Sequence, residues 1–260
     1  GRDGNLCRSG RFRQRIMISL IAAFQFLTII PTIIKRPFTS QEMGRAVGWF
    51  PMVGLALGGI LYVVNALAQK TFSIEITAAL TIMAWVFFTR AFHLDGLMDT
   101  CDGLFGGFTT ERRLEIMRDS RMGAFGVASG ILVLLLKYTA LISVPAHDLM
   151  PALVMATVIG RWTSPLVIVA FPYAREKGMG SAMKENARFP QLILATTIAA
   201  LIAWFLAQTF GILLMLLSAF FAFLISLYII RLLSGLTGDN YGTLTEITET
   251  LILLAFAVEL

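Results

Sequence analysis

Residues 90–126 read RAFHLDGLMDTCDGLFGGFTTERRLEIMRDSRMGAFG and stand between two long apolar runs, at residues 74–92 and 127–144. A helix needs about 20 apolar residues to cross a bilayer, and both runs approach that length. Apolar runs without regular alternation are typical of membrane helices. Similar runs occur along the rest of the chain, at about residues 47–68, 149–171, 192–210, 211–233 and 244–260, with another at residues 16–34 that contains Pro31. The sequence therefore predicts an all-α, polytopic membrane helix bundle of about 7–8 apolar segments.

The composition supports this fold class. Hydrophobic residues make up 57% of the chain and charged residues 14%, whereas soluble proteins carry roughly 25% charged residues. The net charge of +5 comes from basic residues in the loops between apolar runs, where the positive-inside rule explains them. We therefore expect a lipid bilayer as surroundings and no nucleic acid as partner.

The chain divides into a short leader and one membrane domain. Residues 1–15 are polar and basic, and we expect a disordered or non-native leader there. Residues 16–260 show no internal repeat and no long linker, which predicts a single domain. The run at residues 16–34 either crosses the membrane or only dips into it. Loops 90–121 and 173–190 carry basic residues and are expected on the cytoplasmic side, whereas the 143–150 loop has no Lys or Arg and is expected on the opposite side.

Three carboxylates share one predicted helix face. Asp95, Asp99 and Asp102 are spaced i, i+4 and i+7, which on a helix places them within about two turns of one another. Like charges this close repel unless a cation sits among them. Carboxylate oxygens suit Mg²⁺, with Mn²⁺ as the alternative, so we predict a metal site. A solvated acidic helix end is the structural alternative.

Basic residues follow these acids in the sequence. Arg118 and Arg121 flank Asp119, close to Gly123. Guanidinium groups bind phosphate in a bidentate manner, which predicts that these arginines bind a diphosphate. An ordinary positive loop is the alternative. Arg161 lies inside an apolar run, where an arginine faces a polar cavity or a carboxylate partner, and we predict that it points into the substrate cavity.

Two later motifs complete the candidate site. The motif YAREKGMG at residues 173–180 supplies Arg175 and Gly178, whose backbone could approach a phosphate. The motif SGLTGDNYGTLTEITE at residues 234–249 supplies Asp239 and Glu246. Further candidates and alternatives accompany them: His93 as a substrate contact or a helix-end hydrogen-bonding residue, Lys137 as a paired or snorkelling side chain, and Thr245 as a helix N-cap.

Four of these motifs, in this order, resemble a known family. HLDGLMDTCDGLFGG, RRLEIMRDSRMGAFG, YAREKGMG and LTGDNYGTLTEITE are similar to motifs of the cobalamin synthases, the adenosylcobinamide-GDP ribazoletransferases, and the likeness begins at about Phe24. The resemblance implies a divalent-metal enzyme of a prokaryotic cytoplasmic (inner) membrane with its active site towards the cytoplasm. It implies that adenosylcobinamide-GDP and α-ribazole, or α-ribazole 5′-phosphate, react to give adenosylcobalamin or its 5′-phosphate and GMP.

For this reaction we hypothesise an in-line transfer at phosphorus. The 5′-hydroxyl of ribazole would attack the phosphorus attached to cobinamide, with Asp119 or Asp239 accepting its proton. Glu246 would lie among the substrate contacts. A homo-oligomer remains open.

Two other functions compete with this reading. The aspartates partly match the signature of the CDP-alcohol phosphotransferases, to which the fold would be related in pattern. A membrane cation transporter is the rival of another class, and it predicts carboxylates spread through the membrane rather than gathered at one face.

Overall fold

The computed structural model describes residues 2–31, 33–175 and 178–258, without the side chains of residues 2–13 and 179. Within these ranges the regular elements are all helices, together with one isolated bridge between Tyr173 and Leu236. The helices are, in order, α1 (Arg2–Leu27), α2 (Ser40–Ala46), the 3₁₀ helix η1 (Val47–Trp49), α3 (Phe50–Ala68), α4 (Ile74–Phe88), α5 (Phe92–Gly106), α6 (Thr110–Ile116), α7 (Ala124–Ser143), α8 (Leu149–Ala170), α9 (Met179–Asn186), α10 (Phe189–Leu233) and α11 (Gly238–Phe256). The predicted fold class is confirmed.

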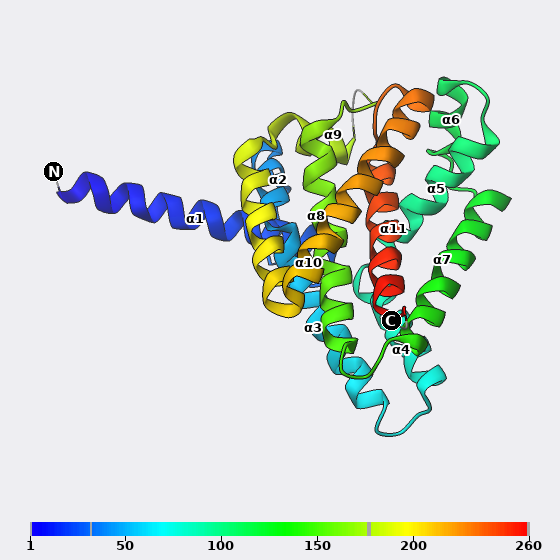
Figure 1. The fold of residues 1–260 in the computed structure, drawn as a ribbon. Coiled ribbons are helices and arrows are strands. Elements are labelled where there is room, and N and C mark those ends of the chain that lie inside the picture. Colours follow the sequence, from blue (N-terminus) through cyan, green and yellow to red (C-terminus); the bar gives the residue numbers. More distant parts are fainter. Residues whose placement is uncertain (1, 32, 176–177, 259–260) are drawn as a thin grey trace.

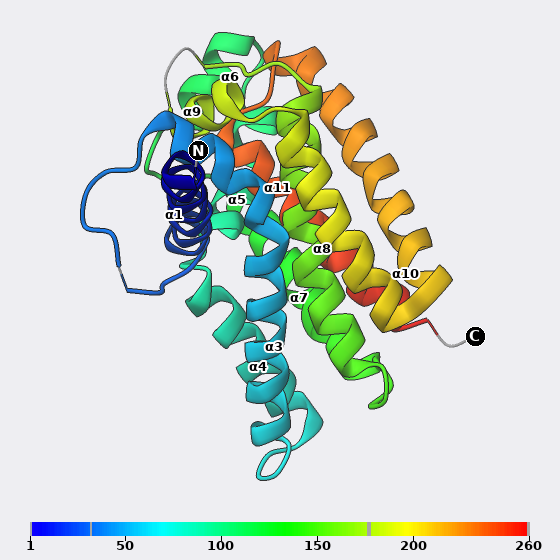
Figure 2. The same cartoon turned by 90° about the vertical axis from the view of Figure 1, so that its left-hand side faces the viewer.

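Helix α8 forms the centre of the bundle and packs against α3, α10 and α11 (Figures 1 and 2). In its most apolar window 89% of the residues are buried, compared with 28% in α7. A helix that is apolar all round belongs in a core, whereas α7 keeps most of its apolar side chains on the outside of the bundle, where lipid would cover them. The elements around α8 therefore hold the polar residues that function could use.

Small residues let α3 approach α8 closely, as the glycines of the 47–68 run predict. A Cβ atom added to Gly54 would lie 2.4 Å from the carbonyl oxygen of Thr157, and one at Gly58 would lie 2.6 Å from the Cα of Val154. No side chain fits at either position. The Thr157 hydroxyl also donates a hydrogen bond to the Gly54 carbonyl oxygen, which ties the two helices together.

The chain bends sharply between α4 and α5, by 86°. Arg90 and Ala91 both adopt positive φ, at 55° and 54°, and this pair of left-handed residues ends α4 and starts α5 in a new direction. The Arg90 guanidinium donates to the Phe26 carbonyl oxygen at 3.0 Å, so the bend is held against the end of α1. Because of this bend, the acidic helix α5 does not continue the apolar path of α4.

Four helical stretches are long and apolar enough to cross a membrane: residues 40–68, α7, α8 and α10. The bent pair α4–α5 would make a fifth. This number is smaller than the 7–8 apolar segments in the sequence for identifiable reasons. Residues 192–210 and 211–233 form the two arms of α10, which turn at Gln208 (Figure 1). The run at 16–34 ends as a helix at Leu27, and α11 carries three acidic residues.

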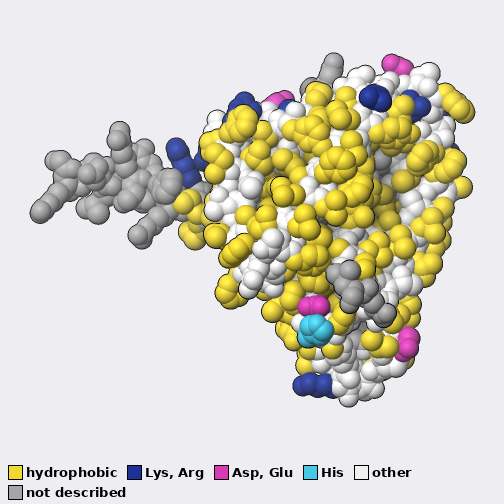
Figure 3. Space-filling view, in the orientation of Figure 1, with side chains coloured by type: hydrophobic (Ala, Val, Ile, Leu, Met, Phe, Trp, Pro, Cys, Tyr) yellow, Lys and Arg dark blue, Asp and Glu magenta, His cyan; other side chains and the backbone are white. Residues whose placement is uncertain are grey.

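The outer surface agrees with a multi-pass membrane protein. Hydrophobic side chains cover most of the face in Figure 3, and most of its Lys and Arg side chains lie towards the end formed by α6 and α9. The connection between α7 and α8 lies at the opposite end (Figure 1), as the absence of Lys and Arg from the 143–150 loop predicts. Residues 2–15 of the proposed leader belong to α1, which extends away from the bundle (Figure 1). Whether the leader is native or disordered stays a prediction.

Candidate active site

Helices α5 and α11 cross in close contact, and this crossing brings two separate motifs together. A Cβ atom at Gly96 would lie 2.7 Å from the carbonyl oxygen of Asp239, and one at Gly242 would lie 3.1 Å from the Cα of His93. No side chain fits at Gly96, and a Cβ at Gly242 would make an unusually tight contact. Asp239, which is distant in sequence, is thereby placed beside the acidic segment of α5.

The beginning of α11 is fixed by a capping box. The Thr237 side chain accepts from the Asn240 backbone N–H, and the Asn240 side chain accepts from the Thr237 backbone N–H. Such a reciprocal pair satisfies N–H groups that a helix start leaves free. Thr245 was predicted as a cap, and this is wrong: Thr245 lies inside α11, where its hydroxyl donates to the Tyr241 carbonyl oxygen. The helix therefore starts early enough to include Asp239 in its first turn.

The three aspartates of α5 have different surroundings. Asp95 is exposed, Asp99 is partly buried, and Asp102 is buried. The Asp102 carboxylate accepts backbone N–H groups of Gly123 at 2.7 Å and of Gly126 at 2.8 Å. It therefore caps the N-terminus of α7, a role that the i+7 spacing does not reveal. Each oxygen of Asp102 thus already accepts one N–H group, so Asp95 and Asp99 are the more accessible α5 carboxylates, and a metal role for Asp102 stays a prediction.

Asp239 forms an ion pair with Arg175 at 2.8 Å. The partners meet because the segment after α8 pairs with the segment before α11: the Ala174 N–H donates to the Leu236 carbonyl oxygen at 2.8 Å. Burial raises the pKa of Asp239 above its usual value, and the opposing effect of Arg175 does not cancel this rise. The structure thus joins two predicted site residues in a partly buried pair next to α5.

Asp119 lies in a different environment from Asp239. Its carboxylate accepts from the Arg121 guanidinium at 2.6 Å, and the Arg121 side chain is 88% exposed. This partner lowers the pKa of Asp119 to about 2. Arg118 is exposed as well. These three residues form a charged surface loop at the α6 end of the molecule. Their roles in diphosphate binding and proton transfer stay predictions.

Arg161 and Glu246 lie deeper than the sequence suggested. Arg161 donates to Glu249 at 2.5 Å, while Lys137 donates to Glu246 at 2.6 Å and also to Glu249. All four side chains are buried. The pairing of Arg161 with a carboxylate follows one of the two expected outcomes for a buried arginine. Arg161 is not among the residues that line the cavity described below, and its place in a substrate cavity stays a prediction. These four residues link α7, α8 and α11.

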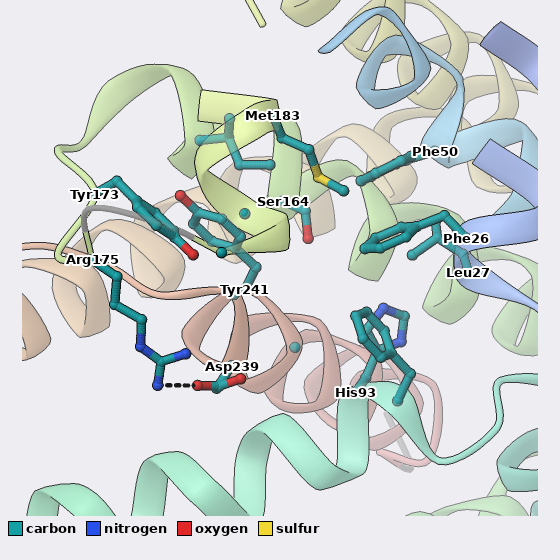
Figure 4. A pocket seen from close by; sticks show the side chains of 16 residues that line it. Phe26, Leu27, Phe50, His93, Ser164, Tyr173, Arg175, Met183, Asp239 and Tyr241 are labelled. Atoms are coloured by element: carbon teal, nitrogen blue, oxygen red, sulfur yellow. Dashed lines mark hydrogen bonds and ion pairs between the residues drawn. The ribbon is translucent and has the colours of Figure 1, made fainter. Parts of the chain in front are cut away.

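A cavity opens beside the Asp239–Arg175 pair (Figure 4). Four residues predicted for the site line it, namely His93, Arg175, Gly178 and Asp239. Sequence reasoning missed its aromatic and aliphatic walls, which come from α1, α3, α5, α9, α11 and the loop after α8: Phe26, Leu27, Phe50, Phe92, Tyr173, Met183 and Tyr241. Each of these positions reads as ordinary core in the sequence, so only the fold could bring them together.

The acidic residues next to this cavity fit a magnesium ion that is shared with a phosphate. Among the described residues, no three His, Cys, Asp or Glu side chains gather closely enough to hold a metal ion by themselves. Mg²⁺ is usually held by one or two carboxylates together with substrate phosphates and water. Asp95 and Asp99, one helical turn apart and near Asp239, offer such oxygen donors.

A bundle of apolar helices with carboxylates and an arginine beside a cavity at one end defines a multi-pass membrane protein with an enzyme-like site. The chain belongs to the cobalamin-5-phosphate synthase family, whose profile matches residues 19–257. The family thus covers the whole bundle.

Individual relatives agree with this family. An adenosylcobinamide-GDP ribazoletransferase of Desulfitobacterium hafniense is 39% identical over 92% of this chain and 96% of its own length. Proteins with the same name from Desulforamulus reducens and Pseudomonas aeruginosa are 38% and 37% identical. No solved structure matches the chain. The chain is therefore a cobalamin-synthesis transferase by family, and the relation to CDP-alcohol phosphotransferases stays a prediction.

Proposed function

We propose that this protein transfers the cobinamide phosphate of adenosylcobinamide-GDP to α-ribazole, or to α-ribazole 5′-phosphate, and releases GMP. The name of the relatives supports the two substrates. One structural observation supports the site most directly: the Asp239–Arg175 pair at the cavity lies beside the carboxylates of α5. The Asp239 carboxylate as a base, the Arg175 guanidinium as a positive charge and the α5 carboxylates as metal ligands are thereby available next to a space for substrate.

The reaction breaks one phosphoanhydride bond and forms one phosphate ester. A ribose hydroxyl oxygen attacks the phosphorus attached to cobinamide, the bond from that phosphorus to the GMP oxygen breaks, and the hydroxyl proton passes to a base. The 5′-hydroxyl expected from the sequence does not suit both acceptors, because α-ribazole 5′-phosphate has that oxygen already esterified. A secondary hydroxyl of the ribose is the nucleophile that both acceptors share.

Asp239 is the better of the two candidate bases. A base must hold the substrate proton transiently, which favours a pKa raised towards the working pH. Burial raises the pKa of Asp239, whereas Arg121 lowers that of Asp119 to about 2. Asp239 also lines the cavity, while Asp119 lies on the surface loop. We therefore assign proton acceptance to the Asp239 carboxylate.

The reaction also requires positive groups that offset the negative charge of the diphosphate. Asp95 and Asp99 would hold Mg²⁺ or Mn²⁺, which when bound would offset negative charge on the diphosphate. Arg175 lies beside Asp239 and would orient the reacting phosphate. Arg118 and Arg121 lie outside the cavity on the α6 loop, where they would attract the anionic substrate as it approaches.

The proposed location is the inner membrane of a prokaryote, with the cavity open towards the cytoplasm. The apolar helices support the membrane, and the concentration of basic side chains at the α6 and α9 end supports the orientation. In this arrangement the soluble nucleotide and corrinoid substrates reach the cavity from the cytoplasm.

One assay tests the activity. Purified protein in lipid is incubated with Mg²⁺, adenosylcobinamide-GDP and α-ribazole, and the corrinoid product and GMP are followed by chromatography. We expect equal amounts of both products from the wild type and strongly reduced amounts from Asp239→Asn. CDP-diacylglycerol with a polyol serves as the alternative substrate pair. Release of CMP from that pair, without GMP release from the first, contradicts the proposal.

A further inference from the structure

The cavity beside Asp239 has two chemically different ends. Figure 4 shows Arg175, Tyr173 and Asp239 towards one end, and Phe26, Phe50 and His93 towards the other. At the second end the rings of Phe26 and Phe92 meet edge to face at 5.1 Å, and those of Phe26 and Phe50 lie stacked at 6.3 Å. A ligand in this cavity would therefore place an apolar, flat group among rings and a polar group beside the ion pair.

The imidazole of His93 is the polar feature of the aromatic end. His93 is 3% exposed, and its Nδ1 atom is buried without any hydrogen-bond partner within the described part of the chain. The imidazole also lines the cavity, so a ligand bound there can form a hydrogen bond with the ring. A ring nitrogen of a heteroaromatic base could accept a hydrogen bond from a neutral imidazole.

The aromatic and the polar residues line one and the same cavity. Asp239 and Arg175 belong to the same wall as Phe26, Phe50 and Phe92. The sugar of a ligand whose base lies among the rings would therefore extend towards the Asp239–Arg175 pair.

The two proposed substrates each carry a heteroaromatic ring system, guanine in one and the base of α-ribazole in the other. The side chains of the cavity wall suit one of these rings better than the other. Guanine carries polar groups at N7, O6 and N2, and each of these groups needs a partner when buried. The aromatic end offers chiefly Phe26, Phe50, Phe92 and Leu27. The base of α-ribazole is a mostly apolar bicycle with one free ring nitrogen, which matches one imidazole among apolar walls.

We infer that this cavity binds the base of the nucleoside acceptor, with His93 hydrogen-bonded to its free ring nitrogen and the ribose directed towards Asp239. This inference rests on the proposed function and adds the acceptor subsite to it. It also explains how a hydroxyl would reach the Asp239 carboxylate: the base lies among the rings, so the ribose lies towards the Asp239–Arg175 pair.

Variants at the two histidines of the chain test the inference. His93→Phe keeps a ring but removes the hydrogen bond, and His93→Gln keeps a polar group that can donate and accept. His147→Phe is the matched control, because the His147 side chain is 81% exposed and does not line the cavity. We expect His93→Phe to raise the KM for α-ribazole about tenfold, with the KM for adenosylcobinamide-GDP unchanged. His93→Gln should recover part of the loss, and His147→Phe should match the wild type.

A binding measurement separates this inference from the proposed activity. Equilibrium dialysis of α-ribazole, and separately of GMP, against the purified protein without any corrinoid reports on the subsite alone. We expect His93→Phe to weaken α-ribazole binding about tenfold and to leave GMP binding unchanged. If the variant weakens GMP instead, or if neither ligand is affected, the subsite assignment is overturned. Absence of GMP release in the assay, with α-ribazole binding intact, would reject the activity and not the subsite.

Discussion

Arg161 donates a hydrogen bond to Glu249 at 2.5 Å with both side chains fully buried. Removing one partner of such a pair leaves an uncompensated buried charge, which costs about 3–5 kcal/mol. We expect Arg161→Met to lower stability by this amount, measured by thermal unfolding in detergent. Arg112→Met is the control, because the Arg112–Glu115 pair is exposed on both sides and its loss should change the melting temperature little. Equal melting temperatures for the two variants would show that the buried pair does not stabilise the bundle.

Variants of Asp102 and Asp99 should distinguish a loss of stability from a loss of magnesium binding. Asp102→Ala removes the cap on α7 and should reduce stability by about 1–2 kcal/mol, with the magnesium concentration for half-maximal turnover unchanged. Asp99→Asn should leave the melting temperature near that of the wild type and should raise this magnesium requirement at least tenfold. Titrating Mg²⁺ after treatment with a chelator gives the comparison. An Asp99 variant with wild-type magnesium dependence would remove that residue from the proposed metal site.

The contact between Gly96 and Asp239 makes α5 and α11 sensitive to a single methyl group. A Cβ at Gly96 would lie 2.7 Å from the Asp239 carbonyl oxygen, so Gly96→Ala must push the helices apart. We expect turnover to fall at least tenfold. Gly59→Ala provides the matched glycine, since a Cβ there meets nothing within 4 Å, and its stability should rise by about 0.5–1 kcal/mol because the position is helical. Similar turnover for both variants would contradict a tight helix contact at the site.

The pH dependence of turnover should report on Asp239. A base acts in its ionised form, so the rate should fall as pH drops through the pKa of Asp239, which burial places above the usual aspartate value. Asp239→Glu should retain an acid limb at a shifted position, while Asp239→Asn should lose most turnover at every pH. Asp119→Asn should keep the wild-type profile, because the pKa of Asp119 is about 2 and this group is ionised throughout the neutral range. An acid limb that disappears in Asp119→Asn would reverse the assignment.

Continuous apolar runs predicted the membrane bundle, and the glycines at 54 and 58 predicted a close helix contact that the structure confirms. Both features depend only on the type of residue at neighbouring positions, which can be read from the sequence. The break at Arg90 and Ala91 could not be predicted in the same way, because neither residue type usually adopts positive φ. Sequence therefore located the acidic segment correctly without showing that it turns away from α4.

Side-chain partners from distant segments were harder to predict than positions. Arg161 needed a carboxylate or a cavity, and only the packing of α8 against α11 showed that Glu249 was the partner. Asp102 resembled its neighbours in spacing, yet the start of α7 determines what its oxygens bind. The aromatic residues at 26, 50 and 92 lie on three helices, and each has the appearance of ordinary core.

The 86° bend at Arg90 and Ala91 affects whether a large substrate, and not only a small ion, can reach the α5 carboxylates. A helix that continued straight from α4 would bury its carboxylates among neighbouring spans, where only a small ion could reach them. In the orientation proposed above, turning α5 sideways instead would leave Asp95 and Asp99 open to an approach from the cytoplasm. A corrinoid, which is far wider than a helix, could then dock with its diphosphate arm over the cavity while its ring stays in the water above the bilayer.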